Sequence, residues 1–90
     1  MYTLKPTPYE VSKEIAQRHR NLRKQLKMSQ AEMAQRSGVS LGSLKRFENT
    51  GKISLESLLK LMHLLGHLDD FDNVLKAKEN YNNIEKLFSK

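Results

Sequence analysis

The residues between Ser29 and Lys52 that are best suited to chemistry are cations, hydroxyls and amides. Arg46 carries a planar guanidinium, which can donate two hydrogen bonds to the O6 and N7 atoms of a guanine. Lys45 and Lys52 carry point charges that suit phosphate oxygens, because cationic contacts to DNA go mostly to its backbone. These groups favour binding of a polyanion over catalysis. Base readout is the expected role of Arg46, and the alternative is a phosphate contact or a solvated side chain.

Other kinds of site find less support. His63 and His67 have the spacing of two metal ligands on a helix, but zinc needs three or four ligands and no further His or Cys is near in sequence. The acids Asp69, Asp70 and Asp72 lack the glycine and the distal glutamate of a calcium loop. No nucleophile is paired with an oriented base. We therefore expect no metal, no cofactor and no enzymatic activity.

Composition agrees with one small domain that has a polyanionic partner. The 90 residues suffice for a single core, 38% are hydrophobic and 29% are charged. Residues 1–60 hold 12 Lys and Arg against 5 Asp and Glu (+7), whereas residues 61–90 hold 4 against 5 (−1). Such a basic surface attracts phosphates and releases counterions on contact.

The sequence gives no sign of export or of a membrane anchor. Cysteine is absent, which excludes disulfides. Met1 to Glu10 lacks an apolar signal region, and the most apolar stretch, Leu55 to Leu68, is interrupted by Lys60 and Gly66. We expect a cytoplasmic protein that is associated with the nucleoid when it binds DNA.

Capping signals predict where the first helix lies. Thr7 at the N-cap, Pro8 at the first helical position and Glu10 three residues after the cap form a capping box. The helix is expected to end near Lys27. Its inward positions are expected to be the apolar residues at helical spacing: Val11, Ile15, Leu22 and Leu26.

Two short helices follow with almost no chain between them. A second capping box at Ser29 opens one helix, which Gly38 stops, and Ser40 can cap the next. In that next helix Leu44 and Phe47 face inward. The opposite stripe holds Gly42, Lys45, Arg46 and Asn49. The tight joint is typical of a helix-turn-helix that reads DNA, but an ordinary corner between two helices makes the same demands.

The rest of the chain is expected to complete an all-α domain of five helices. Ser54 opens a broadly apolar fourth helix that ends at Gly66, and Asp69 or Asp70 is expected to cap a fifth. The fifth helix would carry Phe71, Val74 and Leu75.

We accordingly divide the chain into three parts. Residues 1–7 form an N-terminal arm and residues 8–78 the domain. Residues 79–90 form a tail or short helix suited to a dimer or partner contact.

Three pieces of sequence carry a family resemblance. They are Met28-Ser29-Gln30-Ala31-Glu32-Met33-Ala34, Ser37-Gly38-Val39-Ser40 and Ser43-Leu44-Lys45-Arg46-Phe47-Glu48-Asn49. With them the chain from Ile15 through Phe71 resembles the Cro/C1-type (XRE) helix-turn-helix family. The resemblance implies a lambda-repressor-like fold that binds double-stranded DNA.

The resemblance also implies roles for individual residues. Base contacts are expected from the first turn and outer face of the third helix, at Leu41, Gly42, Ser43 and Arg46. Phosphate contacts are expected from Ser29, Gln30, Ser40, Lys45, Asn49 and Lys52. Glu48 matches an acid that pairs with an arginine of the first helix, and Arg23 stands at that match. Leu41 and Gly42 depart from the polar residues often found there, which suggests a thymine-methyl contact and a close approach.

The last part of the resemblance concerns partners. The segment from Ser43 to Phe71 is similar to HipB-like regulators, which accompany HipA-like kinase toxins, and this implies an antitoxin role. The apolar residues of the C-terminal third either complete the monomer core or form a dimer seam. We predict a homodimeric repressor on a pseudo-palindromic operator. The alternative is a protein-interaction adaptor that keeps the fold without binding DNA.

Overall fold

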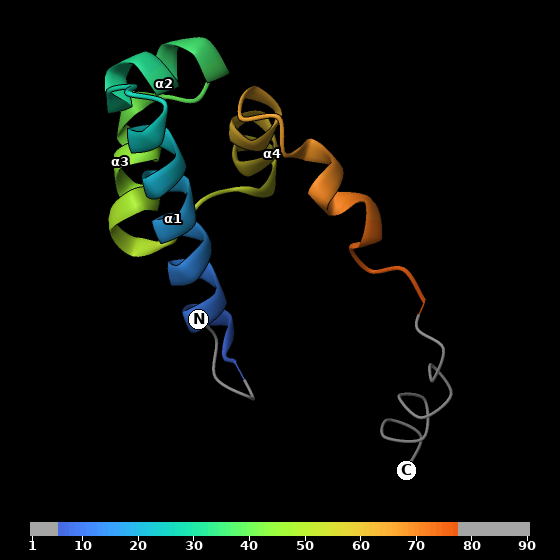
Figure 1. Cartoon of the computed structure of the whole chain (residues 1–90). Helices are drawn as coiled ribbons and strands as arrows, with labels where there is room; N and C mark the ends of the chain where they lie inside the picture. Colours follow the sequence, from blue (N-terminus) through green and yellow to red (C-terminus); the bar gives the residue numbers. More distant parts are fainter. Residues whose placement is uncertain (1–5, 78–90) are drawn as a thin grey trace.

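The computed structural model describes residues 6–77, which form four α-helices and one 3-10 helix (Figure 1). In chain order they are α1 (Pro8–Gln25), α2 (Gln30–Ser37), α3 (Leu41–Thr50), α4 (Leu55–Leu64) and η1 (Leu68–Asn73). No described residue lies in a strand, so the five-helix, all-α prediction is confirmed. The predicted boundary at residue 79 and the short helix or tail beyond it lie outside the described residues.

Hydroxyl caps begin all four α-helices, as the sequence predicts. The Thr7 hydroxyl accepts the N–H of Glu10 at 3.1 Å, and the Glu10 carboxylate accepts the N–H of Thr7 at 3.1 Å, which completes the capping box. The hydroxyls of Ser29, Ser40 and Ser54 each accept the N–H three residues on at 3.0–3.1 Å. These bonds satisfy N–H groups that have no partner inside the helix. The predicted second capping box is wrong in one respect, because the Glu32 carboxylate pairs with Arg36 at 2.8 Å instead of accepting the N–H of Ser29.

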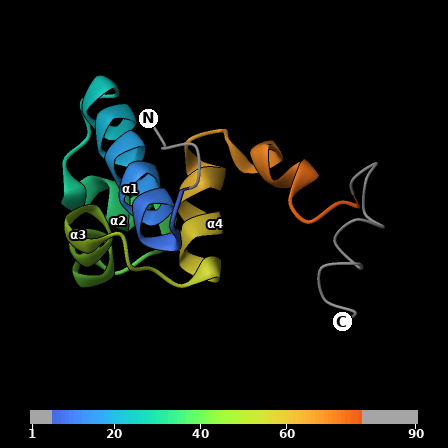
Figure 2. The ribbon, with the colours of Figure 1, turned by 90° about the horizontal axis from the view of Figure 1, so that it is seen from below.

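The core lies where α1 and α2 pack against α3, and where α4 packs against α2 (Figures 1 and 2). Contacts join α1 to α3, α2 to α3, and α2 to α4. The buried hydrophobic residues are Ala16, Met33, Ala34, Val39, Leu44, Phe47 and Leu61. The prediction that Leu26 faces inward is wrong, because Leu26 is the C-cap of α1 and is 52% exposed. The buried face of α1 consists instead of Ala16, His19 and Arg23.

The fifth helix differs from its prediction in type and length. The helix η1 is a 3-10 helix of 6 residues, and its N-cap is His67, which makes no side-chain cap bond. Val74 and Leu75 therefore lie beyond the helix, not within it. The stretch is rich in Asp and Asn, which compete with the helix backbone for hydrogen bonds, and short runs of this kind favour the tighter 3-10 turn.

Candidate nucleic-acid interface

Two residues, Gly38 and Val39, separate α2 from the N-cap of α3. Gly38 has φ +82°, and its N–H donates to the carbonyl oxygen of Ala34 at 3.0 Å, which closes α2. Glycine adopts this left-handed conformation without the steric cost of a Cβ atom. Val39 is 4% exposed and joins the core, and Ser40 begins α3. The joint therefore holds the two helices at a fixed angle.

One face of α3 lies in the core and the other is open to solvent. Leu44 and Phe47 are buried, as predicted. The exposed face comprises the predicted contact residues Leu41, Gly42, Ser43, Lys45, Arg46 and Asn49. A Cβ atom at Gly42 would meet no atom within 4 Å, so packing within the chain does not require a glycine there. Its small size instead leaves room for another molecule to approach the helix backbone.

A polar cleft of about 190 Å³ lies between α3 and the start of α4. Its lining residues are Ser43, Arg46, Lys52, Ile53, Ser54 and Ser57. Three of the predicted contact residues, Ser43, Arg46 and Lys52, thus lie in one cleft together with the N-cap of α4. Cations and a helix N-terminus both favour an anion. Ser54 and Ser57 were not predicted as contacts, although the capping signal at Ser54 placed a helix start there.

The start of α2 carries Ser29 and Gln30. The Ser29 hydroxyl is occupied as the N-cap and remains exposed. Gln30 is half-buried, and its Nε2 donates to Oε1 of Glu48 at 3.0 Å. Because an amide nitrogen carries two hydrogens, the second one remains for a phosphate. The structure thus gives Gln30 a role inside the fold that the sequence did not predict.

The carboxylate of Glu48 connects three helices. Arg23 of α1 donates from Nε to Oε2 and from Nη2 to Oε1, both at 2.9 Å, and His19 Nδ1 lies 2.8 Å from Oε2. Arg23 also donates from Nη1 to the carbonyl oxygen of Met28 at 2.9 Å, in the loop before α2. With the bond from Gln30, the carboxylate of α3 is attached to both α1 and α2. The structure therefore brings the expected pair, Arg23 and Glu48, together.

Burial and hydrogen bonding set the protonation of this cluster. Burial alone raises the pKa of Glu48, but hydrogen bonds from Arg23 and Gln30 outweigh it and hold the pKa below its ordinary 4.5. Burial lowers the pKa of His19 from 6.5, in part offset by its hydrogen bond to Glu48. Near neutral pH the carboxylate is therefore ionised and the imidazole neutral. Since the carboxylate only accepts, Nδ1 of His19 carries the proton.

His19 is the member of the cluster to which the sequence analysis assigned no role at all. His19 is 5% exposed, and its ring packs edge-on against that of Phe47 with 5.5 Å between the ring centroids. Its buried Nε2 has no hydrogen-bond partner among the described residues. The spacing held a signal, because His19 precedes Arg23 by four residues and so shares its helix face.

Two further properties concern the described residues as a whole. Within residues 6–77, no helix is long and apolar enough to cross a bilayer. Over the same range, no three or more His, Cys, Asp or Glu side chains gather as metal ligands would.

The paired helices, the exposed outer face of α3 and the neighbouring basic cleft define a helix-turn-helix DNA-binding domain. A family model described as Helix-turn-helix matches residues 20–71, which is more than half of the chain. The chain belongs to the Cro/C1-type (XRE) helix-turn-helix family of transcription regulators. Comparisons with curated proteins and with solved structures give no match.

Proposed function

We propose that the chain is a sequence-specific transcriptional repressor that binds a pseudo-palindromic operator as a homodimer. The observation that carries the proposal is that α3 has one face buried in the core and the opposite face exposed to solvent. Leu44, Phe47 and Glu48 hold the helix in place, whereas Arg46 lies exposed beside Lys52. A helix held rigidly on one side and polar on the other is suited to the major groove.

The contacts we propose follow from the position of each side chain. Arg46 reads a guanine through its fork of donors, Leu41 touches a thymine methyl group, and Ser43 bonds to a base edge. Gly42 lets the helix approach the base pairs closely. The backbone phosphates are held by Ser29, Gln30, Ser40, Lys45, Asn49 and Lys52, which position the protein without reading sequence.

Two copies are needed because a single recognition helix covers only a few base pairs. In a two-fold dimer the two α3 helices enter successive major grooves, about 34 Å apart, and the operator is then nearly palindromic. A repressor of this kind acts by occupying DNA that the polymerase needs.

The test starts with selection of the preferred duplex from a random pool by the full chain. Fluorescence anisotropy then measures affinity for that duplex and for an unrelated one over a series of salt concentrations. Arg46→Ala should weaken binding to the selected duplex by about 5- to 150-fold, the worth of a bidentate base contact, and affect the unrelated duplex much less. Affinity should fall steeply with salt.

Arg36→Ala is the matched control. Arg36 is also exposed, but it pairs with Glu32 at 2.8 Å and lines a hollow with Lys60 and His63, two residues of α4. We expect this variant to bind DNA like the unmodified chain. If the chain binds no duplex, or binds with no salt dependence, the repressor proposal is wrong and the adaptor alternative is favoured.

The antitoxin role extends the proposal and is supported by the resemblance of the segment from Ser43 to Phe71 to HipB-like regulators. In that case a HipA-like kinase is encoded beside this chain and binds it. Inspection of the neighbouring gene, followed by co-purification of its product with the tagged chain, tests this. If the neighbour encodes no kinase and nothing co-purifies, the antitoxin role is wrong.

A further inference from the structure

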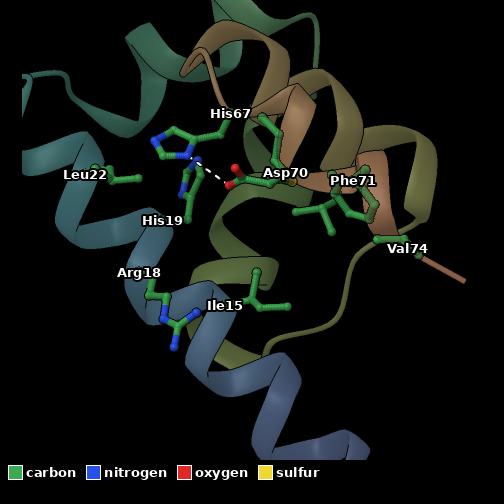
Figure 3. Close-up of a pocket in the computed structure, with 10 residues that line it drawn as sticks. Ile15, Arg18, His19, Leu22, His67, Asp70, Phe71 and Val74 are labelled. Atoms are coloured by element: carbon green, nitrogen blue, oxygen red, sulfur yellow. Dashed lines mark hydrogen bonds and ion pairs between the residues drawn. The ribbon is translucent and has the colours of Figure 1, made fainter. Parts of the chain in front are cut away.

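An apolar groove with a cavity volume of about 480 Å³ lies between α1, α4 and η1 (Figure 3). Its apolar lining residues are Ile15, Leu22, Leu58, Met62, Phe71 and Val74. Figure 3 shows Ile15 and Leu22 of α1 on one side and Phe71 and Val74 on the other. No residue of α3 lines the groove, so it is separate from the face that we assign to DNA.

Apolar surface continues from the groove onto the chain around η1. Leu68, Val74 and Leu75 are 42%, 51% and 98% exposed. Leu61 is the single fully buried residue of α4, whose other leucines in the groove region are half-buried. Exposed apolar side chains that cluster in this way mark a surface that another chain covers.

The charge distribution favours a second copy of the same chain as that partner. Residues 61–90 have a net charge of −1, whereas residues 1–60 have +7. Two copies that meet through the segment after α4 therefore bring parts of low net charge together, and α1 contributes mainly Ile15 and Leu22 to the groove. The exposed face of α3 remains free for phosphates. Contact through the basic part would instead be opposed by like-charge repulsion.

The sequence beyond the described residues contains a short apolar segment. Ile84, Leu87 and Phe88 are spaced i, i+3 and i+4, so one helical turn would present all three on one side. The six residues 78–83 separate this segment from Ala77 and can span up to about 20 Å. Val74, which lines the groove, lies three residues before Ala77 in the chain.

We propose that the groove of each copy binds residues 84–88 of a second copy, in a reciprocal exchange that forms the homodimer. The inference rests on the proposed function, which requires two copies. If each groove held residues 84–88 of its own copy, the exposed side chains of η1 would remain uncovered. A two-fold exchange instead brings η1 of both copies to the same interface. In Figures 1 and 2, η1 lies on the side of α4 that faces away from α3, where a second copy has access.

The proposed exchange also involves the cluster around Glu48, which attaches α3 to α1 and α2. His19 lines the groove, and its Nδ1 lies 2.8 Å from Oε2 of Glu48. A segment seated in the groove therefore packs against the residue that anchors the recognition helix. Dimerisation should consequently change the NMR signals of the His19 ring, and dilution to monomer should reverse the change.

Cysteine cross-linking tests the exchange, because the chain has no cysteine of its own. One full-length variant carries Val74→Cys and another Leu87→Cys. After the two are mixed and oxidised, we expect a disulfide-linked dimer that contains one copy of each. A third variant carries both substitutions. If it gives only internally linked monomer and the mixture gives no dimer, the segment binds its own groove and the inference is wrong. Absence of any cross-link also overturns it.

Sedimentation equilibrium supplies an independent measurement. Val74→Glu introduces a charge into the groove and should raise the dimer dissociation constant by about tenfold or more. Leu26→Glu is the matched control, since Leu26 is exposed to a similar degree (52%) and does not line the groove. Equal effects of the two substitutions would contradict the inference.

These outcomes are distinguishable from failure of the proposed function. A chain that binds its operator as a dimer, but shows neither the mixed cross-link nor the effect of Val74→Glu, retains the repressor proposal and refutes the exchange. A chain that forms the mixed cross-link but binds no DNA refutes the repressor proposal alone.

Discussion

Glu48→Gln tests whether one buried carboxylate holds α3 against α1 and α2. The side chain of Glu48 is 2% exposed and that of Arg23 is 9% exposed. The substitution removes the negative charge and places an amide donor opposite a guanidinium that can only donate. Loss of one partner of a buried pair costs about 3–5 kcal/mol, because the other charge remains buried without a counterion.

The size of the domain makes this loss easy to measure. Small domains have a free energy of unfolding of about 5–15 kcal/mol, so the variant loses a large share of it. Each kcal/mol lowers the Tm of a domain of this size by about 4–8 °C, and the Tm should therefore fall by at least about 12 °C. Urea unfolding followed by far-UV circular dichroism gives the free energy directly.

Glu32→Gln is the control for this prediction. Glu32 also pairs with an arginine, Arg36, at 2.8 Å, but the two side chains are 39% and 58% exposed. An exposed pair at this helical spacing contributes about 0.3–0.5 kcal/mol. If Glu48→Gln costs no more than Glu32→Gln, the carboxylate does not hold the three helices together and the reasoning is refuted.

Three other predictions follow from single contacts. Burial holds the pKa of His19 below 6.5, so the unfolded chain binds more protons than the folded one as the pH falls below that value. The free energy of unfolding should therefore fall on acidification. Urea titrations should show that it depends less steeply on pH in His19→Phe. Gly38→Ala should cost about 1–2 kcal/mol in thermal unfolding through its positive φ. Gly51→Ala should cost more, because its Cβ would also lie 3.0 Å from a backbone carbon of α1; equal costs would refute this clash. Lys45→Ala and Lys52→Ala should each weaken binding to all duplexes alike and lower the salt slope by about one, as measured by anisotropy; a loss confined to one duplex would contradict a phosphate role.

The sequence predicts well what depends on neighbouring residues. The hydroxyl of Ser40 bonds to an N–H three residues on, and Gly38 supplies a positive φ at one position, so both signals act within a single turn of chain. Leu44 and Phe47 were placed inward correctly because a helix that must bury a face does so with its apolar stripe. The helix-turn-helix joint follows from these local features together.

Features that depend on distant residues were missed. His19 and Gln30 meet at Glu48 across 29 and 18 residues of sequence. The spacing of His19 and Arg23 indicates a shared helix face, but it does not identify a partner so far along the chain. The same holds for Leu26, which has the spacing of a core residue but comes after the last residue of α1. The prediction of a longer fifth helix failed because an apolar pattern was weighed above the poor helix propensity of Asp and Asn.

The division of α3 into two faces has a consequence for protein engineering. Leu41, Gly42, Ser43 and Arg46 are exposed, while the helix is anchored through its other side. Random libraries at these four positions should therefore yield mostly folded variants, from which altered operator preferences can be screened without re-optimising the scaffold. The domain separates the residues that hold its helices together from the exposed residues that we propose read the operator.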